Sequence, residues 1–378
     1  MELLRVRVPL AAPWITAGGT LHARDVVLIR VVFGGQEGWA ECVAHPEPTY
    51  SAEYVEGAWD VLGRHLIPRL LSAQPGDAQQ VAGVLAPVKG HQMAKAALEL
   101  ALLDAQLRAT GRPLARYLAD RLPGAPAPAK CVPAGVAVGL SGSLDALVAE
   151  VGRFVDDGYQ RVKLKIQPGW DEAPVAALRR VFGPRLALQV DANGAYADVS
   201  DAAGALLTLD GHGLVCIEQP LGDDDMVGHA ELGLVLSTPI CLDEGVASPA
   251  DAETALALGA CRVLNIKAGR VGGYLAAVDI AARCARAGVP VWCGGMVETG
   301  LGRAANLALA ALAPFTLTGD VSASDRFWAH DIVTAPTVLH AGGTIAVPSG
   351  PGVGVEVRGD VVAGALSREW HPGGTPSS

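Results

Sequence analysis

Two lysines lie one residue apart in the apolar stretch RVKLKI at 161–166. Residues two apart in a β-strand point to the same face, so the ammonium groups of Lys163 and Lys165 should lie side by side. A neighbouring cation lowers the pKa of a lysine towards the range that suits a general base. A further lysine, Lys267, ends the apolar stretch RVLNIK. We therefore expect these lysines to serve in proton transfer, and Lys163 also to bind a substrate carboxylate.

Acidic residues end the apolar stretches that lie between these lysines in the chain. They are Asp191 in LALQVD, Glu218 in LVCIE and Asp243 in PICLD. Carboxylates gathered at one edge of a sheet repel one another, and a divalent cation relieves that repulsion. Oxygen ligands without His or Cys favour Mg²⁺, with Mn²⁺ or another divalent metal able to substitute. The sequence thus predicts a metal site flanked by lysines.

This combination suits removal of a proton from the carbon next to a carboxylate. That proton is very weakly acidic, and a divalent metal on the carboxylate oxygens spreads the charge of the enediolate that forms. The second and sixth strands of an eight-stranded barrel stand opposite each other, so Lys165 and Lys267 would approach the substrate from opposite sides. One lysine could take a proton and the other return one. The predicted substrate is a small-molecule carboxylate.

A repeating pattern from about residue 131 onward supplies the elements that position these residues. Short apolar stretches alternate with Ala-rich helical stretches, such as one beginning at Ser248 and ending at Gly259, and this alternation predicts a parallel sheet. Repeated eight times, it predicts a (β/α)8-type barrel, TIM-like or (β/α)7β, with its site at the carboxyl ends of the strands. The apolar stretches are 132–140, 161–166, 186–191, 214–218, 239–243, 262–267, 289–295 and 316–320.

The first 125 residues differ in pattern from this barrel. The stretches LLRVRVPL, VVLIRVVFG and GWAECV predict an antiparallel meander, and helical stretches follow at 51–71 and 91–111. We expect an α+β capping domain at 1–125, the catalytic barrel at 126–325 and a C-terminal segment at 326–378 that returns to the cap.

The C-terminal segment carries its own expectations. The stretch GTIAVPSGPGVGVEV predicts a pair of strands, which we expect to join the capping domain. The tail HPGGTPSS is expected to be disordered.

Composition argues against several classes of protein. The 378 residues are half apolar and 18% charged, with a formal net charge of −10 and no dense cluster of Lys or Arg. Nucleic acid and membrane surfaces are therefore not expected as partners, and no apolar run is long enough to span a bilayer. The 7 cysteines lack CxxC spacing, which favours reduced thiols and a cytoplasmic location.

In the segments that carry these lysines and carboxylates, the chain resembles the enolase superfamily, and in particular its branch of o-succinylbenzoate synthases and N-acylamino acid (N-succinylamino acid) racemases. The resemblance implies that Lys165 and Lys267 are the acid/base pair and that Asp191, Glu218 and Asp243 bind Mg²⁺. It also implies assembly into a homo-oligomer. The segments that carry it are KLKIQPGWD, VDANGAY, IEQPL, CLDEGVAS, LNIKAGRVGG, WCGGMVETGLGRAANLALA and GDVSASDRFW.

The same resemblance assigns residues around the metal and the substrate. Asn193 and Glu244 would lie near the metal, and Gly295 and Met296 would line the pocket for the acyl group. The region around Tyr50 and its neighbour Pro48 would form a wall of that pocket.

A loop at 15–25 resembles the mobile lid of the family. Relatives often carry Ser and a bulky Phe where this chain has Ala17 and Gly18, and Ser where it has Ala137. Ala137 would line the substrate pocket. These departures leave the preferred acyl group open but do not affect the chemistry.

Several functions fit these residues. One is dehydration to o-succinylbenzoate in menaquinone biosynthesis, a lyase reaction, and another is racemisation of N-acylamino acids, an isomerase reaction. A dipeptide epimerase or muconate cycloisomerase-like enzyme would share the lysines and carboxylates, and Asp320 or Asp325 could then recognise a dipeptide. A non-catalytic binding barrel is disfavoured because every lysine and carboxylate is present. The roles of His22, His45 and Glu298 stay open.

Overall fold

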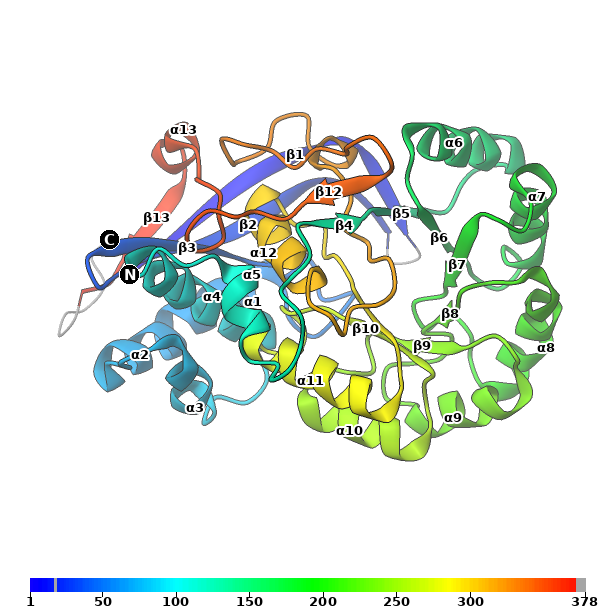
Figure 1. Cartoon of the computed structure of the whole chain (residues 1–378), viewed down its shortest axis with the longest axis horizontal. Coiled ribbons are helices and arrows are strands. Elements are labelled where there is room, and N and C mark those ends of the chain that lie inside the picture. The colour runs from blue at the N-terminus through cyan, green and yellow to red at the C-terminus, as the bar shows by residue number, and fades with distance from the viewer. Residues whose placement is uncertain (17–18, 372–378) are drawn as a thin grey trace.

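The computed structural model describes residues 1–16 and 19–371, and its first part is an antiparallel sheet with helices packed on it (Figure 1). Its strands are β1 (Glu2–Thr16), β2 (Gly19–Phe33), β3 (Gln36–Cys42) and β13 (Leu366–Glu369), in the order β13-β1-β2-β3. The predicted meander is confirmed. Because β13 pairs with β1, residues 366–369 lie beside residues 2–5.

The two predicted stretches, 51–71 and 91–111, are largely helical, and further short helices at 78–85 and 114–119 were not predicted. The longest helix, α4 (Gln92–Ala109), packs against β2 and β3 and is buried on most of its surface. A Cβ atom at Gly38 would lie 2.1 Å from the backbone oxygen of Ala101, so this close approach of β3 to α4 requires glycine. The elements are α1 (Val55–Val61), η1 (Leu62–Leu66), α2 (Ile67–Ala73), η2 (Ala78–Gln80), α3 (Val81–Leu85), α4 (Gln92–Ala109) and α5 (Leu114–Ala119).

The second part is the predicted barrel, drawn mainly in green and yellow in Figure 1. Its strands are all parallel and neighbours in sequence are neighbours in the sheet, which confirms the fold class. They are β5 (Gly135–Val138), β6 (Arg161–Lys165), β7 (Ala187–Asp191), β8 (Ile217–Glu218), β9 (Ile240–Leu242), β10 (Val263–Ile266) and β11 (Val291–Cys293).

The eighth predicted strand, at 316–320, does not form a regular strand. The segment nevertheless occupies the eighth position, because Asp320 N–H donates to Cys293 O (3.1 Å) on β11 and Gly319 forms an isolated parallel bridge with Ala134. A Cβ atom at Gly319 would lie 2.4 Å from Cys293 O, so the segment passes too close to β11 for any other residue. The barrel therefore closes through an irregular segment.

Helices surround the barrel strands, and the helix predicted at 248–259 is confirmed. The Ser248 side chain accepts from Asp251 N–H (3.2 Å) at its start, and Gly259 has φ of 65° at its end. The elements are α6 (Leu144–Asp157), α7 (Glu172–Phe182), α8 (Val199–Leu209), η3 (Asp210–His212), α9 (Met226–Val235), α10 (Pro249–Leu258), α11 (Tyr274–Ala287), α12 (Gly300–Ala310) and η4 (Ser324–Arg326).

The expected pair of C-terminal strands at 343–357 is wrong in part. The first half is strand β12 (Thr344–Ala346), but it pairs with β4 (Cys131–Pro133) and not with the cap sheet. The second half forms no strand, since Pro348 and Pro351 lack the N–H groups that a ladder needs. It still contacts the cap, where Val353 N–H donates to the carboxylate of Asp104 on α4 (2.7 Å). A short helix, α13 (Gly359–Ala363), precedes β13. Residues 372–378 of the expected disordered tail lie outside the described residues.

Carboxylates of the cap bind the N-termini of barrel helices. Glu99 of α4 accepts from the first two N–H groups of α11, at 2.6 and 3.2 Å. Glu41 of β3 accepts from Thr299 N–H (3.1 Å) and Gly302 N–H (3.3 Å) at the start of α12. Helix N-termini attract negative charge, but burial raises the pKa of both Glu41 and Glu99 to about 7. These contacts fix the cap on the barrel.

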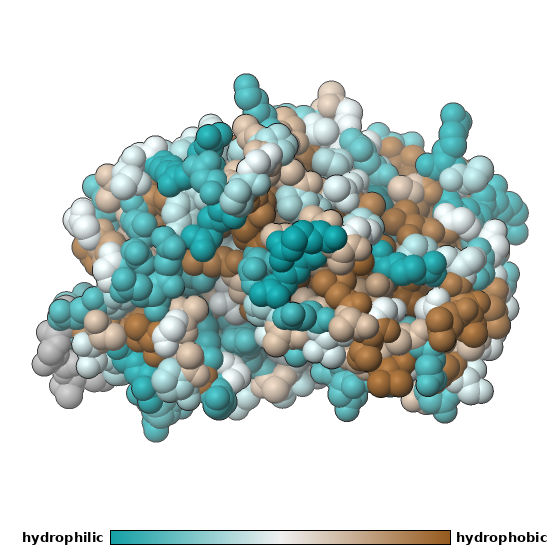
Figure 2. Space-filling view, turned by 60° about the horizontal axis from the view of Figure 1, so that its bottom comes forward, coloured by the Kyte–Doolittle hydropathy of each residue, from teal (hydrophilic) through white to brown (hydrophobic). Residues whose placement is uncertain are grey.

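An apolar surface lies on the outer helices of the barrel, where Figure 2 shows a brown patch at the lower right. Its residues Leu207, Val227, Leu234, Val235 and Leu258, on α8 to α10, are 48–87% exposed. Exposed apolar patches are typical of protein contacts, and the expected homo-oligomer stays a prediction. Throughout the described ranges, no helix has the length and apolar character needed to cross a membrane.

Candidate active site

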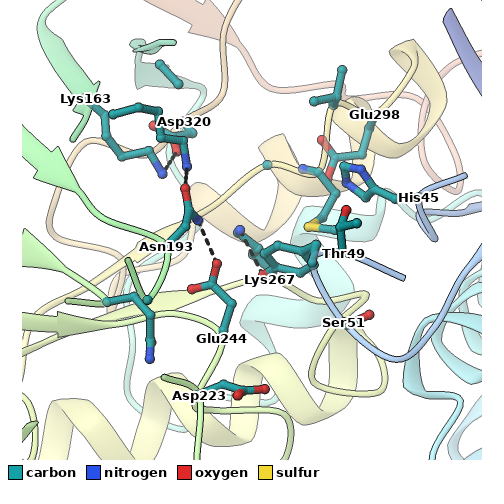
Figure 3. Close-up of a pocket in the computed structure, with 18 of the residues that line it drawn as sticks. His45, Thr49, Ser51, Lys163, Asn193, Asp223, Glu244, Lys267, Glu298 and Asp320 are labelled. Atoms are coloured by element: carbon teal, nitrogen blue, oxygen red, sulfur yellow. Dashed lines mark hydrogen bonds and ion pairs between the residues drawn. The ribbon is translucent and has the colours of Figure 1, made fainter. Parts of the chain in front are cut away.

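A cavity of about 620 Å³ lies at the carboxyl ends of the barrel strands and is also lined by cap residues 48–52. Apart from the predicted metal-binding carboxylates, every predicted site residue lines it: Lys163, Lys165, Lys267, Asn193, Glu244, Tyr50, Ala137, Gly295 and Met296. Figure 3 shows Lys163 and Asp320 on one side of the cavity and His45 and Glu298 on the other.

The two lysines of β6 point to the same face, as their spacing predicts. Their Nζ atoms lie 2.9 Å (Lys163) and 2.7 Å (Lys165) from the same oxygen of Asp191. Lys163 also contacts Glu218 (3.1 Å) and Asp320 (2.7 Å). Burial opposes the charged form of Lys163, but these carboxylates raise its pKa well above the ordinary value. The role of Lys165 as a base stays a prediction.

Lys267 reaches the cavity from β10, which three intervening strands separate from β6 in the sheet. Its Nζ donates to Asp243 (2.7 Å) and to the Tyr50 hydroxyl (3.0 Å), and it lies 4.5 Å from the centre of the Tyr50 ring. The lysine is 6% exposed and therefore does not face bulk water. It stands across the carboxylates from Lys165.

The predicted metal ligands are fully buried directly beneath the lysines. Asp191 and Glu218 are partners in register on neighbouring strands, and Lys163 lies between their carboxylates. Burial opposes ionisation of Asp191, yet its lysine neighbours hold its pKa well below the usual range. Burial and the charge of Asp191 raise the pKa of Glu218. Asp243 is instead bound by Lys267 and Arg270.

The side chains at the predicted metal site can be compared with those that bind Mg²⁺ in proteins. Among the residues that the structure describes, no three Asp, Glu, His or Cys side chains have the mutual arrangement of a metal site. The donors nevertheless suit Mg²⁺, because all are oxygens at adjacent strand ends. Glu244 Oε2 is also buried without a hydrogen-bond partner, while its Oε1 accepts from Asn193 (2.7 Å). Asp191, Glu218 and Asp243 would hold the ion, with Glu244 and Asn193 beside it.

Two residues that contact this group were missed in the sequence. Arg270 donates to Asp243, to the Tyr50 hydroxyl (3.1 Å) and to a backbone carbonyl of β10 (2.7 Å). Gln219 has φ of 39°, and its Oε1 accepts from Asp243 N–H (2.9 Å). The sequence does contain a hint of both residues, because Arg270 lies in LNIKAGRVGG close to Lys267 and Gln219 lies in IEQPL directly after Glu218.

The structure also shows where the other residues lie whose roles the sequence left open. Asp320 is bound by both Lys163 and Arg161 (2.6 Å), so its carboxylate belongs to this ionic cluster. His45 lines the cavity, and burial together with nearby positive charge lowers its pKa well below the ordinary value. His22 is exposed. Glu298 lines the cavity, and its Oε1 accepts from Met296 N–H and from Asn306 (both 2.8 Å).

The predicted lid can be placed only in part. Its residues on either side of the tip belong to β1 and β2, which form a long hairpin. Ala17 and Gly18, where the chain departs from its relatives, lie outside the described residues.

Comparison with known proteins places the chain in a family. Residues 146–361 match the enolase C-terminal domain-like family, and residues 1–119 match the N-terminal domain of mandelate racemase and muconate lactonizing enzyme. The N-succinylamino acid racemase of an Amycolatopsis species is 52% identical over 94% of both chains. The chain belongs to the enolase superfamily.

Further relatives within the enolase superfamily agree with this assignment. The o-succinylbenzoate synthase of Geobacillus kaustophilus is 43% identical over 94% of this chain and 92% of that protein. A crystal structure of an enolase superfamily member from Listeria innocua has a TM-score of 0.90 at 39% identity and 97% coverage of both chains. The L-Ala-D/L-Glu epimerase of Bacillus subtilis is more distant, at 27% identity over 94% of this chain and 95% of that protein. The resemblance stated from the motifs is thereby confirmed.

Proposed function

We propose that the chain is an enzyme that abstracts a proton next to a carboxylate, acting as an o-succinylbenzoate synthase, as an N-succinylamino acid racemase, or as both. The observation that carries this proposal is the pair of largely enclosed amines, Lys165 and Lys267, which reach one cavity from opposite strands with carboxylates between them. Both reactions are supported by the names of relatives, a racemase at 52% identity and a synthase at 43%.

The chain's residues divide the work of proton transfer. A Mg²⁺ ion bound at the strand-end carboxylates would stabilise negative charge on the substrate carboxylate. Lys163 lies beside Asp191 and Glu218, close enough to orient the carboxylate of a substrate bound there. Lys165 takes the proton from one face of the carbon and Lys267 returns a proton to the other face in racemisation. In the synthase reaction one lysine removes the α-proton, and the hydroxyl group then takes a proton from the resulting ammonium group and leaves as water.

The cavity also explains why a lysine can act here. Both amines are mostly enclosed, with side chains 11% (Lys165) and 7% (Lys267) exposed, and an enclosed site excludes water from the carbanionic intermediate. Tyr50 and Asp243 hold the amine of Lys267 in place through hydrogen bonds. Asn193 and Asp191 do the same for Lys165.

The alternative functions receive less support. Dipeptide recognition by Asp320 would require a free carboxylate, but both of its oxygens are engaged by Arg161 and Lys163. A binding barrel without catalysis would not need two amines directed at buried carboxylates. A cytoplasmic location and assembly into homo-oligomers remain predictions.

Deuterium exchange tests the proposal. The purified protein with Mg²⁺ in D₂O should place deuterium on the α-carbon of an N-succinylamino acid, as followed by NMR. A parallel assay should follow formation of o-succinylbenzoate from its cyclohexadiene carboxylate precursor. Loss of both activities on chelation would support the metal. Absence of exchange and of dehydration would refute the proposal, whereas either activity alone would assign the reaction.

A further inference from the structure

His229 is a histidine of α9 that is 1% exposed and lies outside the cavity. Its Nδ1 lies 2.6 Å from the backbone oxygen of Asp225. A carbonyl oxygen can only accept, so Nδ1 carries the ring proton. Burial lowers the pKa of His229, and the ring is therefore neutral, with Nε2 as an acceptor. Leu221 N–H donates to this Nε2 (3.3 Å).

The same ring nitrogen of His229 faces the side chain of Gln219. Gln219 Nε2 lies 3.4 Å from it and donates to Leu221 O (3.1 Å). An acceptor attracts the NH₂ end of an amide and repels its oxygen, so this contact determines which way the Gln219 side chain is turned. Its Oε1 is thereby directed towards the end of the neighbouring strand, β9.

Gln219 joins the strand ends that carry the predicted metal ligands. Its Oε1 accepts from Asp243 N–H (2.9 Å) and Gly245 N–H (3.3 Å), which follow β9. Its backbone oxygen accepts from Gly194 N–H (2.7 Å), in the loop that follows β7. Gln219 itself comes directly after Glu218, the last residue of β8. One side chain and one peptide group thus connect the ends of β7, β8 and β9.

Gln219 keeps this arrangement in a strained backbone conformation. Its φ of 39° lies in the left-handed region, which residues other than glycine adopt at a cost in free energy. Such a conformation persists where its surroundings hold it. Without the acceptor on the His229 ring, the amide would be free to reverse. Asp243 N–H and Gly245 N–H would then face an NH₂ group and lose their acceptor.

We infer that His229 is a positioning residue of the metal site that acts through Gln219. Its neutral ring, with the proton on Nδ1, orients the amide that joins the carboxyl ends of β7, β8 and β9. This inference rests on the proposed function for the ion at these strand ends, Mg²⁺. Changing a partner one step removed from a metal typically alters the affinity about 10- to 100-fold. His229 therefore determines the affinity for Mg²⁺ although its ring lies outside the cavity.

Variants that keep one contact of the ring and lose the other test this role. His229→Gln keeps an acceptor near the position of Nε2, whereas His229→Asn keeps only an N–H near Nδ1 for Asp225 O. The calorimetric Kd of Mg²⁺, measured without substrate, should rise about 10- to 100-fold in His229→Asn and stay close to the wild-type value in His229→Gln. A matched control is His212→Asn, because His212 lies in η3 outside the cavity, and its Kd should equal that of the wild type.

A double-mutant cycle shows whether His229 acts through Gln219. Gln219→Met removes the amide and should raise the Kd by a similar factor, and His229→Asn should add little in that background. The inference is refuted if His229→Asn binds Mg²⁺ like the wild type, or if both His229 variants weaken binding alike, since the ring would then only fill space. Independent effects of the His229 and Gln219 substitutions would also refute it.

The tautomer of His229 provides a test that needs no folded variant. NMR of the wild type labelled with ¹⁵N-histidine should show this ring neutral with its proton on Nδ1, and a proton on Nε2 would overturn the inference. The outcome for the proposed function is separate. Mg²⁺ binding with neither exchange nor dehydration would refute the proposed function and leave the role of His229 standing, whereas a wild type that binds no Mg²⁺ would refute that role.

Discussion

Replacement of Lys163 by methionine should destabilise the metal-free protein strongly and make it more responsive to Mg²⁺. The ammonium group lies 2.7 to 3.1 Å from Asp320, Asp191 and Glu218, and all of these side chains are at most 8% exposed. Removing one partner from a buried ionic cluster costs about 3–5 kcal/mol, because the remaining charges lose their compensation. The unfolding entropy of 378 residues is about 0.8 kcal/mol/K, so Tm should fall by about 4–6 °C.

Mg²⁺ should recover much of that loss, because a dication can replace the missing positive charge. Metal at about 100 times its Kd stabilises by about 2.7 kcal/mol, which corresponds to about 3 °C. The assay is calorimetric Tm in EDTA and in a Mg²⁺ series, with Lys95→Met as the control, since the Lys95 amine donates to a backbone carbonyl. If Lys163→Met is as stable as wild type in EDTA, or gains no more from Mg²⁺ than wild type does, the assignment of a metal to this carboxylate cluster is wrong.

Three further predictions follow from the cap, its junction with the barrel and the cavity. Glu41 and Glu99 have pKa values of about 7 in the folded protein against an ordinary 4.5, so the folded state binds more protons between these values and stability should fall as pH rises through this window. Glu99→Gln should reduce that slope in urea unfolding, and an unchanged slope would contradict the assignment. Gly273 has φ of 144°, and in Gly273→Ala the new Cβ atom would lie 2.3 Å from the Glu99 carboxylate. The free energy of unfolding in urea should therefore fall by about 2–4 kcal/mol. Stability equal to that of the wild type would show that the contact between α4 and α11 can rearrange. Tyr50→Phe removes a hydroxyl 3.0 Å from Lys267 and should lower kcat/KM about 10-fold with no loss of fold by circular dichroism; undiminished turnover would show that the hydroxyl is not needed.

Strand periodicity predicted much of the site. Lys165, Asp191 and Glu218 are successive partners in register across β6, β7 and β8, so their positions at strand ends in the sequence became neighbours in space. This worked because a parallel barrel aligns the carboxyl ends of its strands. The cavity residues on the cap, such as Tyr50, followed only from the resemblance to the family.

Contacts between distant loops could not be predicted in this way. Arg270 resembles any loop arginine until the fold brings it to Asp243, 27 residues earlier in the chain. The segment at 316–320 takes the eighth barrel position as predicted but not as a regular strand, because Gly319 passes too close to β11. The second expected strand in 343–357 does not form, because that stretch is rich in Gly and Pro. The positive φ of Gln219 likewise depends on the hydrogen bonds that its side chain makes across to β9.

Two amines should act on opposite faces of one carbon, and stereospecific exchange in single-lysine variants distinguishes this arrangement from a single base. Lys165→Ala and Lys267→Ala are each incubated with Mg²⁺ in D₂O with either enantiomer of an N-succinylamino acid. We expect both variants to lose racemisation, while each still exchanges the α-proton of one enantiomer, and the two variants should act on opposite enantiomers. Retained racemisation in either variant, or exchange of the same enantiomer by both, would show that Lys165 and Lys267 do not act on opposite faces of the carbon.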